Sequence, residues 1–259
     1  MDNVFTAVLF AIFLFVGMLI LLEAGRRVGR RRLAVDPDGA RAGLGSVDAA
    51  IFALLGLLLA FTFTGAAVRF DARRTLVIEE TNDIGTAWLR LDLLPADAQP
   101  AIRESFRRYL DTRIEAYEKI PNMAAVEDAL ARSAALQTEI WQRAIAATKS
   151  EGAPPSGPML LLPALNAMFD ITTTRTAVTR MHPPVIIFIM LAAVALVSSL
   201  LAGYGMAGGK AHSWIHMISF AAITAISVYV ILDLELPRLG LIRVENFDQL
   251  LIDLRTSMK

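Results

Sequence analysis

The sequence predicts an all-α membrane protein, with four transmembrane helices and a helical extramembrane domain inserted between the second and the third. Three observations lead to this prediction. Hydrophobic residues make up 55% of the 259 residues, and the mean hydropathy is +0.52. The apolar residues gather in four blocks, each long enough to supply the about 20 helical residues that cross a hydrocarbon core. The segment between the second and third blocks spaces its apolar residues as a helix does, without a strand's alternation.

The first apolar block, residues 4–22, is predicted to be a retained membrane helix. A cleavable signal peptide carries its positive charge before the apolar segment. Here only Asp2 precedes the block, and the arginines follow it at positions 26, 27, 30, 31 and 32. The second block, residues 49–68, has Ser46 as a predicted N-cap and runs directly into Arg69 and Asp71. These two helices form a hairpin over residues 1–69.

The third and fourth blocks form a second hairpin over residues 183–235. The third runs from about 185 to 204, after a helix break at His182-Pro183-Pro184, and the fourth runs from 214 to 232. Tyr204 and Trp214 stand at block ends, where amphipathic aromatic side chains favour the membrane interface. Residues 236–259 are predicted to be a C-terminal tail.

Residues 70–182 are predicted to form the helical extramembrane domain. One helix continues from the second span to near Pro95, a second lies between Pro100 and Pro121, and a third precedes a loop at 151–158. Charged residues follow the second span without a turn signal, at positions 69, 71, 73, 74, 79, 80, 83 and 90. Such a helix can line a pore and its vestibule, or it can anchor the membrane interface through internal ion pairs.

The composition excludes several kinds of chemistry. Cysteine is absent, so disulfides, thiolate nucleophiles and Cys-based metal sites are excluded. The formal net charge of +0 gives no global basic field for nucleic acid. No nucleophile elbow, phosphate-binding loop or dinucleotide fingerprint is present. We therefore predict no enzyme, no catalytic residue, no cofactor and no nucleic-acid partner.

Two small groups of polar residues remain as candidates for a metal or ion site. His212 and His216 are four residues apart and would share a helix face, but no third ligand lies near, so we predict no metal site. Asp233 and Glu235 follow the fourth span and are predicted to mark its exit into water. Because a carboxylate in lipid is costly, a buried proton or ion site is the alternative for this pair.

Several segments resemble known membrane proteins. LAFTFTGAAVRF at residues 59–70 is similar to the second helix of bestrophins, and Arg74 and Asn82 stand where an Arg and an Asn follow in bacterial bestrophins. A closer resemblance is to the bacterial integral membrane proteins called bestrophin-like. It is carried by FDARR (70–74), EETNDIGTAWLR (79–90), LPALN (162–166) and GLIRV (240–244).

The resemblance implies a pentameric anion channel with four membrane helices per subunit and a helical domain that prolongs the pore. The chain departs from the bestrophin pattern in two respects. It lacks the acidic calcium clasp of animal bestrophins, and Phe61 matches only one aromatic of the neck, with Leu57 and Ala53 at the preceding turns. The resemblance therefore does not carry calcium gating over to this chain.

The leading interpretation is a homo-oligomeric channel in the cell (inner) membrane, crossing it several times, with the lipid bilayer and small inorganic anions as its partners. Phe61, Leu57 and Ala53 are the predicted constriction. Arg69, Arg74 and Asn82 are the predicted vestibule or domain junction. The alternative is a non-conducting scaffold or sensor whose helical domain binds a protein. An ion-coupled transporter that uses Asp233 or Glu235 is a third possibility.

The orientation in the membrane is predicted by flanking charge. The arginines at 26–32 and Lys210 lie on one side of the predicted hairpins. The positive-inside rule makes that side cytoplasmic and puts residues 70–181 outside the cell. The resemblance to bestrophins implies the reverse, so the two arguments conflict.

Overall fold

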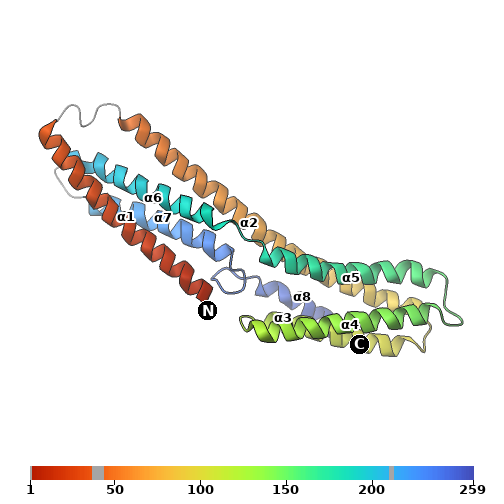
Figure 1. Cartoon of the computed structure of the whole chain (residues 1–259). Coiled ribbons are helices and arrows are strands. Elements are labelled where there is room, and N and C mark those ends of the chain that lie inside the picture. The colour runs from red at the N-terminus through yellow and green to blue at the C-terminus, as the bar shows by residue number, and fades with distance from the viewer. Residues whose placement is uncertain (1, 37–43, 210–212) are drawn as a thin grey trace. The chain divides into compact units, whose positions relative to one another are not determined.

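The computed structural model describes residues 2–36, 44–209 and 213–259, and regular structure within them is helical, without a strand (Figure 1). The α-helices are α1 Asp2–Val35, α2 Leu44–Arg90, α3 Gln99–Glu118, α4 Met123–Thr148, α5 Ser156–Arg180, α6 Val185–Gly205, α7 Trp214–Leu234 and α8 Glu245–Ser257. The predicted loop cation Lys210 and the His212 member of the histidine pair lie outside the described residues.

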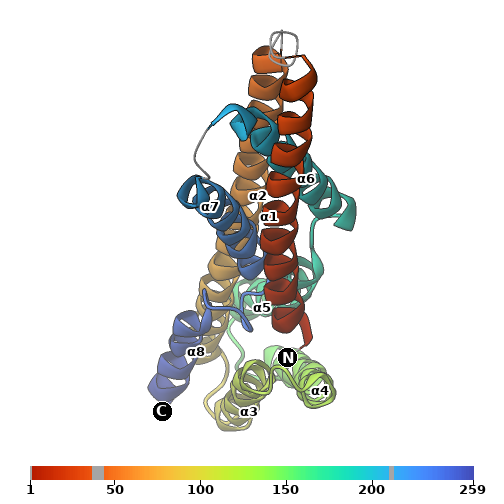
Figure 2. The same ribbon diagram turned by 90° about the vertical axis from the view of Figure 1, so that its left-hand side faces the viewer.

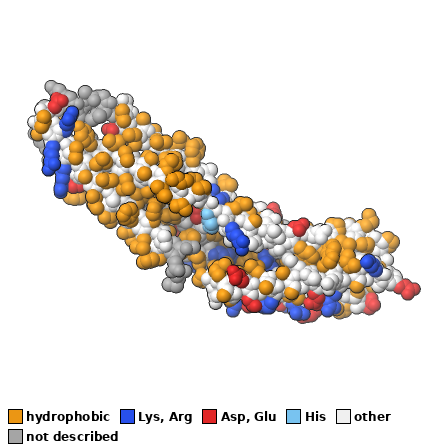
Figure 3. Space-filling model, in the orientation of Figure 1, with side chains coloured by type: hydrophobic (Ala, Val, Ile, Leu, Met, Phe, Trp, Pro, Cys, Tyr) orange, Lys and Arg blue, Asp and Glu red, His pale blue; other side chains and the backbone are white. Residues whose placement is uncertain are grey.

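Four helical segments are long and apolar enough to cross a membrane, and they contain the four predicted blocks. The prediction of an all-helical protein with four candidate membrane helices is therefore confirmed. Hydrophobic side chains cover most of the visible surface around α1, α6 and α7, and Lys and Arg gather where α1 ends (Figure 3).

Helix α2 is one uninterrupted helix of 47 residues, as the absence of a turn signal after the second span predicts. No proline occurs between Leu44 and Arg90 to remove a backbone donor, so the helical hydrogen bonding need not break. The predicted N-cap at Ser46 is wrong, because Ser46 lies inside the helix.

The chain divides into two compact units. The first contains residues 1–70 and 182–242, and the second contains residues 71–181 and 243–259. In the first unit α1 packs along α6 and α7 (Figures 1 and 2). A Cβ atom on Gly203 of α6 would lie 1.9 Å from the carbonyl oxygen of Leu22, and one on Gly25 of α1 would lie 1.9 Å from that of Leu200. These glycines therefore let the two backbones meet directly, as small residues do in membrane helix pairs.

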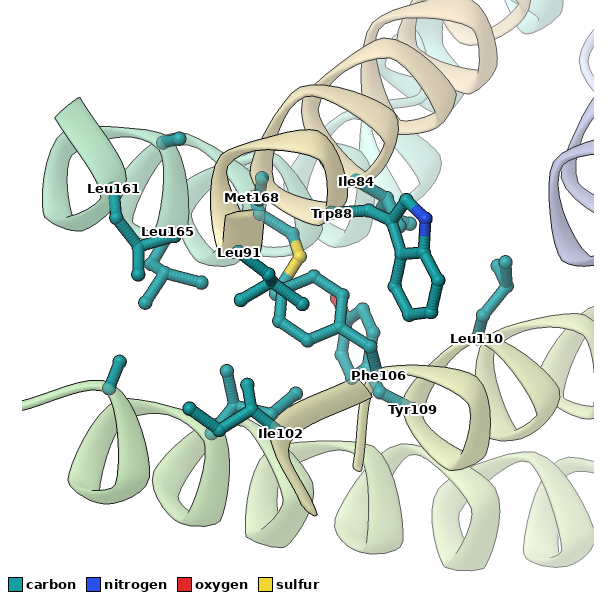
Figure 4. Close-up of a cluster of buried hydrophobic side chains, with 14 of the residues drawn as sticks. Ile84, Trp88, Leu91, Ile102, Phe106, Tyr109, Leu110, Leu161, Leu165 and Met168 are labelled. Carbon is teal, nitrogen blue, oxygen red and sulfur yellow. The ribbon is translucent and has the colours of Figure 1, made fainter. Parts of the chain in front are cut away.

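The second unit has its own core. Side chains from α2, α3 and α5 point toward one another there, and the Trp88 and Phe106 rings pack edge-on with centroids 6.1 Å apart (Figure 4). The segment predicted as a tail contains α8, whose Leu251 is fully buried in this core. The Nε of Arg107 donates to the carbonyl oxygen of Met258 at 3.0 Å, which holds the end of the chain against α3.

Candidate functional site

The predicted constriction residues share one exposed face of α2 in the first unit. Leu57 is 51% exposed, Phe61 is 67% exposed, and Ala53 is also exposed. On the other side of the helix, Leu55 and Ala66 are buried. A spacing of four residues predicts a shared face, but only the structure shows that the rest of the subunit leaves this face uncovered.

Small side chains dominate one strip of this exposed face. At about 100° per residue, Ala49, Ala53, Gly56, Ala60 and Thr64 fall within about 80° of arc, and all of them are exposed. A Cβ atom added to Gly56 would meet nothing within 4 Å. Leu57 and Phe61 flank this small-residue strip, so an approaching helix could come close to the α2 backbone beside them.

Outside this strip, α2 exposes the large apolar side chains of Leu54, Phe63 and Val68. The exposed faces of the other membrane helices resemble that part of α2. They present large apolar side chains, which suit a surface surrounded by lipid tails: Phe5, Ile12, Phe13 and Ile20 on α1, Val185, Ile186 and Ile189 on α6, and Ile215, Ile223 and Ile226 on α7. Among the described membrane helices, α2 thus has the exposed surface that is suited to close contact with another helix.

Arg69 makes a partly buried ion pair at the end of the apolar part of α2. Its Nε and Nη2 atoms donate to Oε1 of Glu235 at 2.8 and 2.6 Å, and the Nδ1 atom of His182 lies 3.4 Å from Oε2. Glu235 is only 5% exposed. Loss of Arg69 would therefore leave a buried carboxylate without its principal cation.

Asp233 holds the chain as it leaves α7. Its carboxylate accepts the backbone N–H groups of Leu241 and Ile242 at 2.8 Å each, and the Tyr229 hydroxyl donates to it at 3.2 Å. A Cβ atom on Gly240 would lie 2.4 Å from Oδ1, so a side chain at this position would have to displace the carboxylate. Asp233 and Glu235 stand at the end of the candidate span Trp214–Leu234, but both are buried in the protein and neither is solvated. That they mark the exit of the helix from the membrane stays a prediction.

The three residues predicted for the vestibule or junction do not form one cluster. Arg69 belongs to the first unit, whereas Arg74 and Asn82 belong to the second. Arg74 pairs with the exposed Asp71 at 3.1 Å, and Asn82 is exposed. The neighbouring Arg73 is buried instead and donates to the Met181 carbonyl at 2.9 Å.

The second unit contains a buried charged cluster that the sequence did not reveal. The Glu80 carboxylate, which is not exposed at all, accepts Arg113 Nε at 2.6 Å and the Tyr117 hydroxyl at 3.1 Å, and it also pairs with Arg175 Nη1. Burial raises the pKa of the adjacent Tyr109 to about 12, so that phenol is neutral at physiological pH. One carboxylate and two guanidinium groups leave this cluster with a formal charge of +1.

One signal for this cluster was present in the sequence. Arg113 is four residues from both Tyr109 and Tyr117, which places it on the apolar face of α3 rather than on its solvated side. Within the described part of the chain, no three metal-ligating side chains come together. His216 lies 2.5 Å from the hydroxyl oxygen of Ser213.

A family model for the bestrophin-like domain matches residues 11–246 of the chain. This protein belongs to the bestrophin-like family. No curated protein and no solved structure matches it. Membership of the bestrophin-like family indicates, at the general level of the family, a membrane anion channel rather than an enzyme. The match includes the exposed face of α2, the Glu80 cluster and the Gly240 turn under Asp233.

Proposed function

We propose that this bestrophin-like protein is an oligomeric membrane channel that conducts small anions along a path lined by the exposed face of α2. The observation that carries the proposal is the small-residue strip on α2, from Ala49 to Thr64, on a face that the subunit itself leaves uncovered. Copies of the chain arranged in a ring could bring these faces to a shared axis. The family resemblance makes five the expected number of copies.

The narrowest part of the path is assigned to Phe61, with Leu57 and Ala53 on the preceding turns. Apolar constrictions of this kind gate by excluding water, whereas selectivity comes from nearby dipoles and charges. From residue 49 to residue 70, α2 carries no acidic side chain, and its one charge is that of Arg69. This part of the helix therefore presents no fixed negative charge to repel an anion.

The proposal also assigns roles to the two units and to the three predicted junction residues. The first unit is the membrane domain, and residues 71–181 form a helical domain outside the lipid that carries the path onward. Arg69, Arg74 and Asn82 act near the junction through separate partners rather than as one site. We also propose that the protein is a multi-pass protein of the cell (inner) membrane.

The test is halide flux from liposomes that contain the purified oligomer. Replacing Phe61 by Ala removes apolar area from the constriction, so water enters more easily and flux should rise while assembly stays normal. Leu55→Ala is the matched control on the buried side of α2, where truncation should cost about 2–5 kcal/mol of stability and give no gain in flux.

Two results would contradict the proposal. Absence of flux from a verified wild-type oligomer would favour the scaffold or sensor alternative. A Phe61→Ala protein that assembles, is less stable and conducts no better than the parent would show that Phe61 is a packed residue and does not line the path.

A further inference from the structure

The second unit has an open groove of about 380 Å³ between α4 and α5, lined by both apolar and polar side chains. Arg113 of α3, Ser133 and Gln137 of α4, and Thr173 and Arg180 of α5 contribute to its lining. None of the described residues that line the groove is acidic. Its volume lies at the small end of the range for small-molecule sites.

The groove lies against the Glu80 cluster. Arg113, which is only 2% exposed, belongs both to the groove lining and to the Glu80 cluster with its formal charge of +1. A buried charge is costly unless other charges offset it. An anion held in the groove would offset that charge while remaining in contact with solvent.

Several hydrogen-bond donors in the groove have no partner in the described part of the chain. The hydroxyl groups of Ser133 and Thr173 make no hydrogen bond there, and the Arg180 guanidinium makes no ion pair. Gln137 makes only long contacts of 3.4 Å, to the hydroxyls of Tyr109 and Thr172. Hydroxyl and guanidinium donors on both sides of a groove suit the several oxygens of an oxyanion better than a single cation.

We propose that the α4–α5 groove is a binding site for a small oxyanion, of the phosphate or carboxylate class. Arg180 supplies the solvent-accessible positive charge, and the hydroxyl groups of Ser133 and Thr173 donate hydrogen bonds from opposite walls of the groove. Arg113 of the Glu80 cluster adds a buried positive charge beneath them. This binding site is separate from the proposed conduction path. The proposal does not depend on conduction, because anion binding is measured without ion flux.

The test is calorimetric titration of the purified full-length protein with sodium phosphate, with sodium chloride at equal ionic strength as the reference. Phosphate should bind to the wild type and raise its unfolding temperature more than chloride does. Arg180→Gln should weaken phosphate binding about tenfold, the effect of losing one charge-assisted contact. Thr173→Val keeps the side-chain shape and should give a smaller, several-fold loss.

Arg143→Gln is the matched control, because Arg143 is an equally charged, exposed residue of α4 that pairs with Glu139 and does not line the groove. It should leave phosphate affinity unchanged. Both test positions are exposed, so these variants should remain folded. The proposal is overturned if the wild type binds no phosphate at millimolar concentrations, or if Arg180→Gln and Thr173→Val bind it as the wild type does.

Discussion

Replacing Gly203 by Ala should destabilise the first unit even though it adds a single methyl group. The new Cβ atom would lie 1.9 Å from the carbonyl oxygen of Leu22, whereas real Cβ atoms essentially never come within 3.0 Å of a neighbour. Because the Leu22 carbonyl oxygen is a backbone atom, it cannot rotate away as the end of a flexible side chain would. Helices α1 and α6 must therefore separate locally by more than an ångström, which opens the contacts along their shared surface.

The size of the effect follows from two opposing contributions. Overpacking of a close contact costs about 1–3 kcal/mol, and a rigid backbone neighbour puts this one near the upper value. Ala is a better helix former than Gly by about 1 kcal/mol. The net loss should be about 2 kcal/mol, which corresponds to roughly 4–8 °C in Tm for a chain of this size.

The assay is thermal unfolding of the detergent-purified protein, followed by tryptophan fluorescence. Gly205→Ala is the matched control, because it lies two residues further along α6 and its added Cβ atom would meet nothing within 4 Å. That variant should be as stable as the parent or slightly more stable. Equal stability of Gly203→Ala and Gly205→Ala would refute the packing argument.

Two further predictions concern the junction and the orientation of the chain. Arg69→Ala should cost up to about 3–5 kcal/mol, because the buried Glu235 loses the guanidinium that donates two hydrogen bonds to it. Arg74→Ala, which breaks an exposed pair, should cost less than about 1 kcal/mol. Unchanged stability of Arg69→Ala with altered ion selectivity would show that Arg69 belongs to the pore instead. An impermeant thiol reagent on intact cells should label Gln142→Cys but not Val35→Cys, both of which sit at exposed positions in a chain without native cysteine. Labelling of Val35→Cys alone would reverse the predicted orientation.

The sequence by itself determined the features that depend on local composition. A span is decided by about 20 consecutive residues and a lipid solvent, so the four candidate membrane helices could be located without tertiary information. The continuity of α2 is also local, because it depends on the absence of a helix breaker between Leu44 and Arg90. The shared face of Ala53, Leu57 and Phe61 follows from helical spacing alone.

Tertiary structure decided which polar residues are buried and what they contact. Asp233 follows an apolar block just as a residue entering water would, yet the turn at Gly240 brings two backbone N–H groups onto it. Glu80 finds its cations 33 and 95 residues away, on α3 and α5. A buried charged side chain needs partners, and distant segments supply those of Glu80. A helical period records the face on which a residue lies but not the residue that it meets.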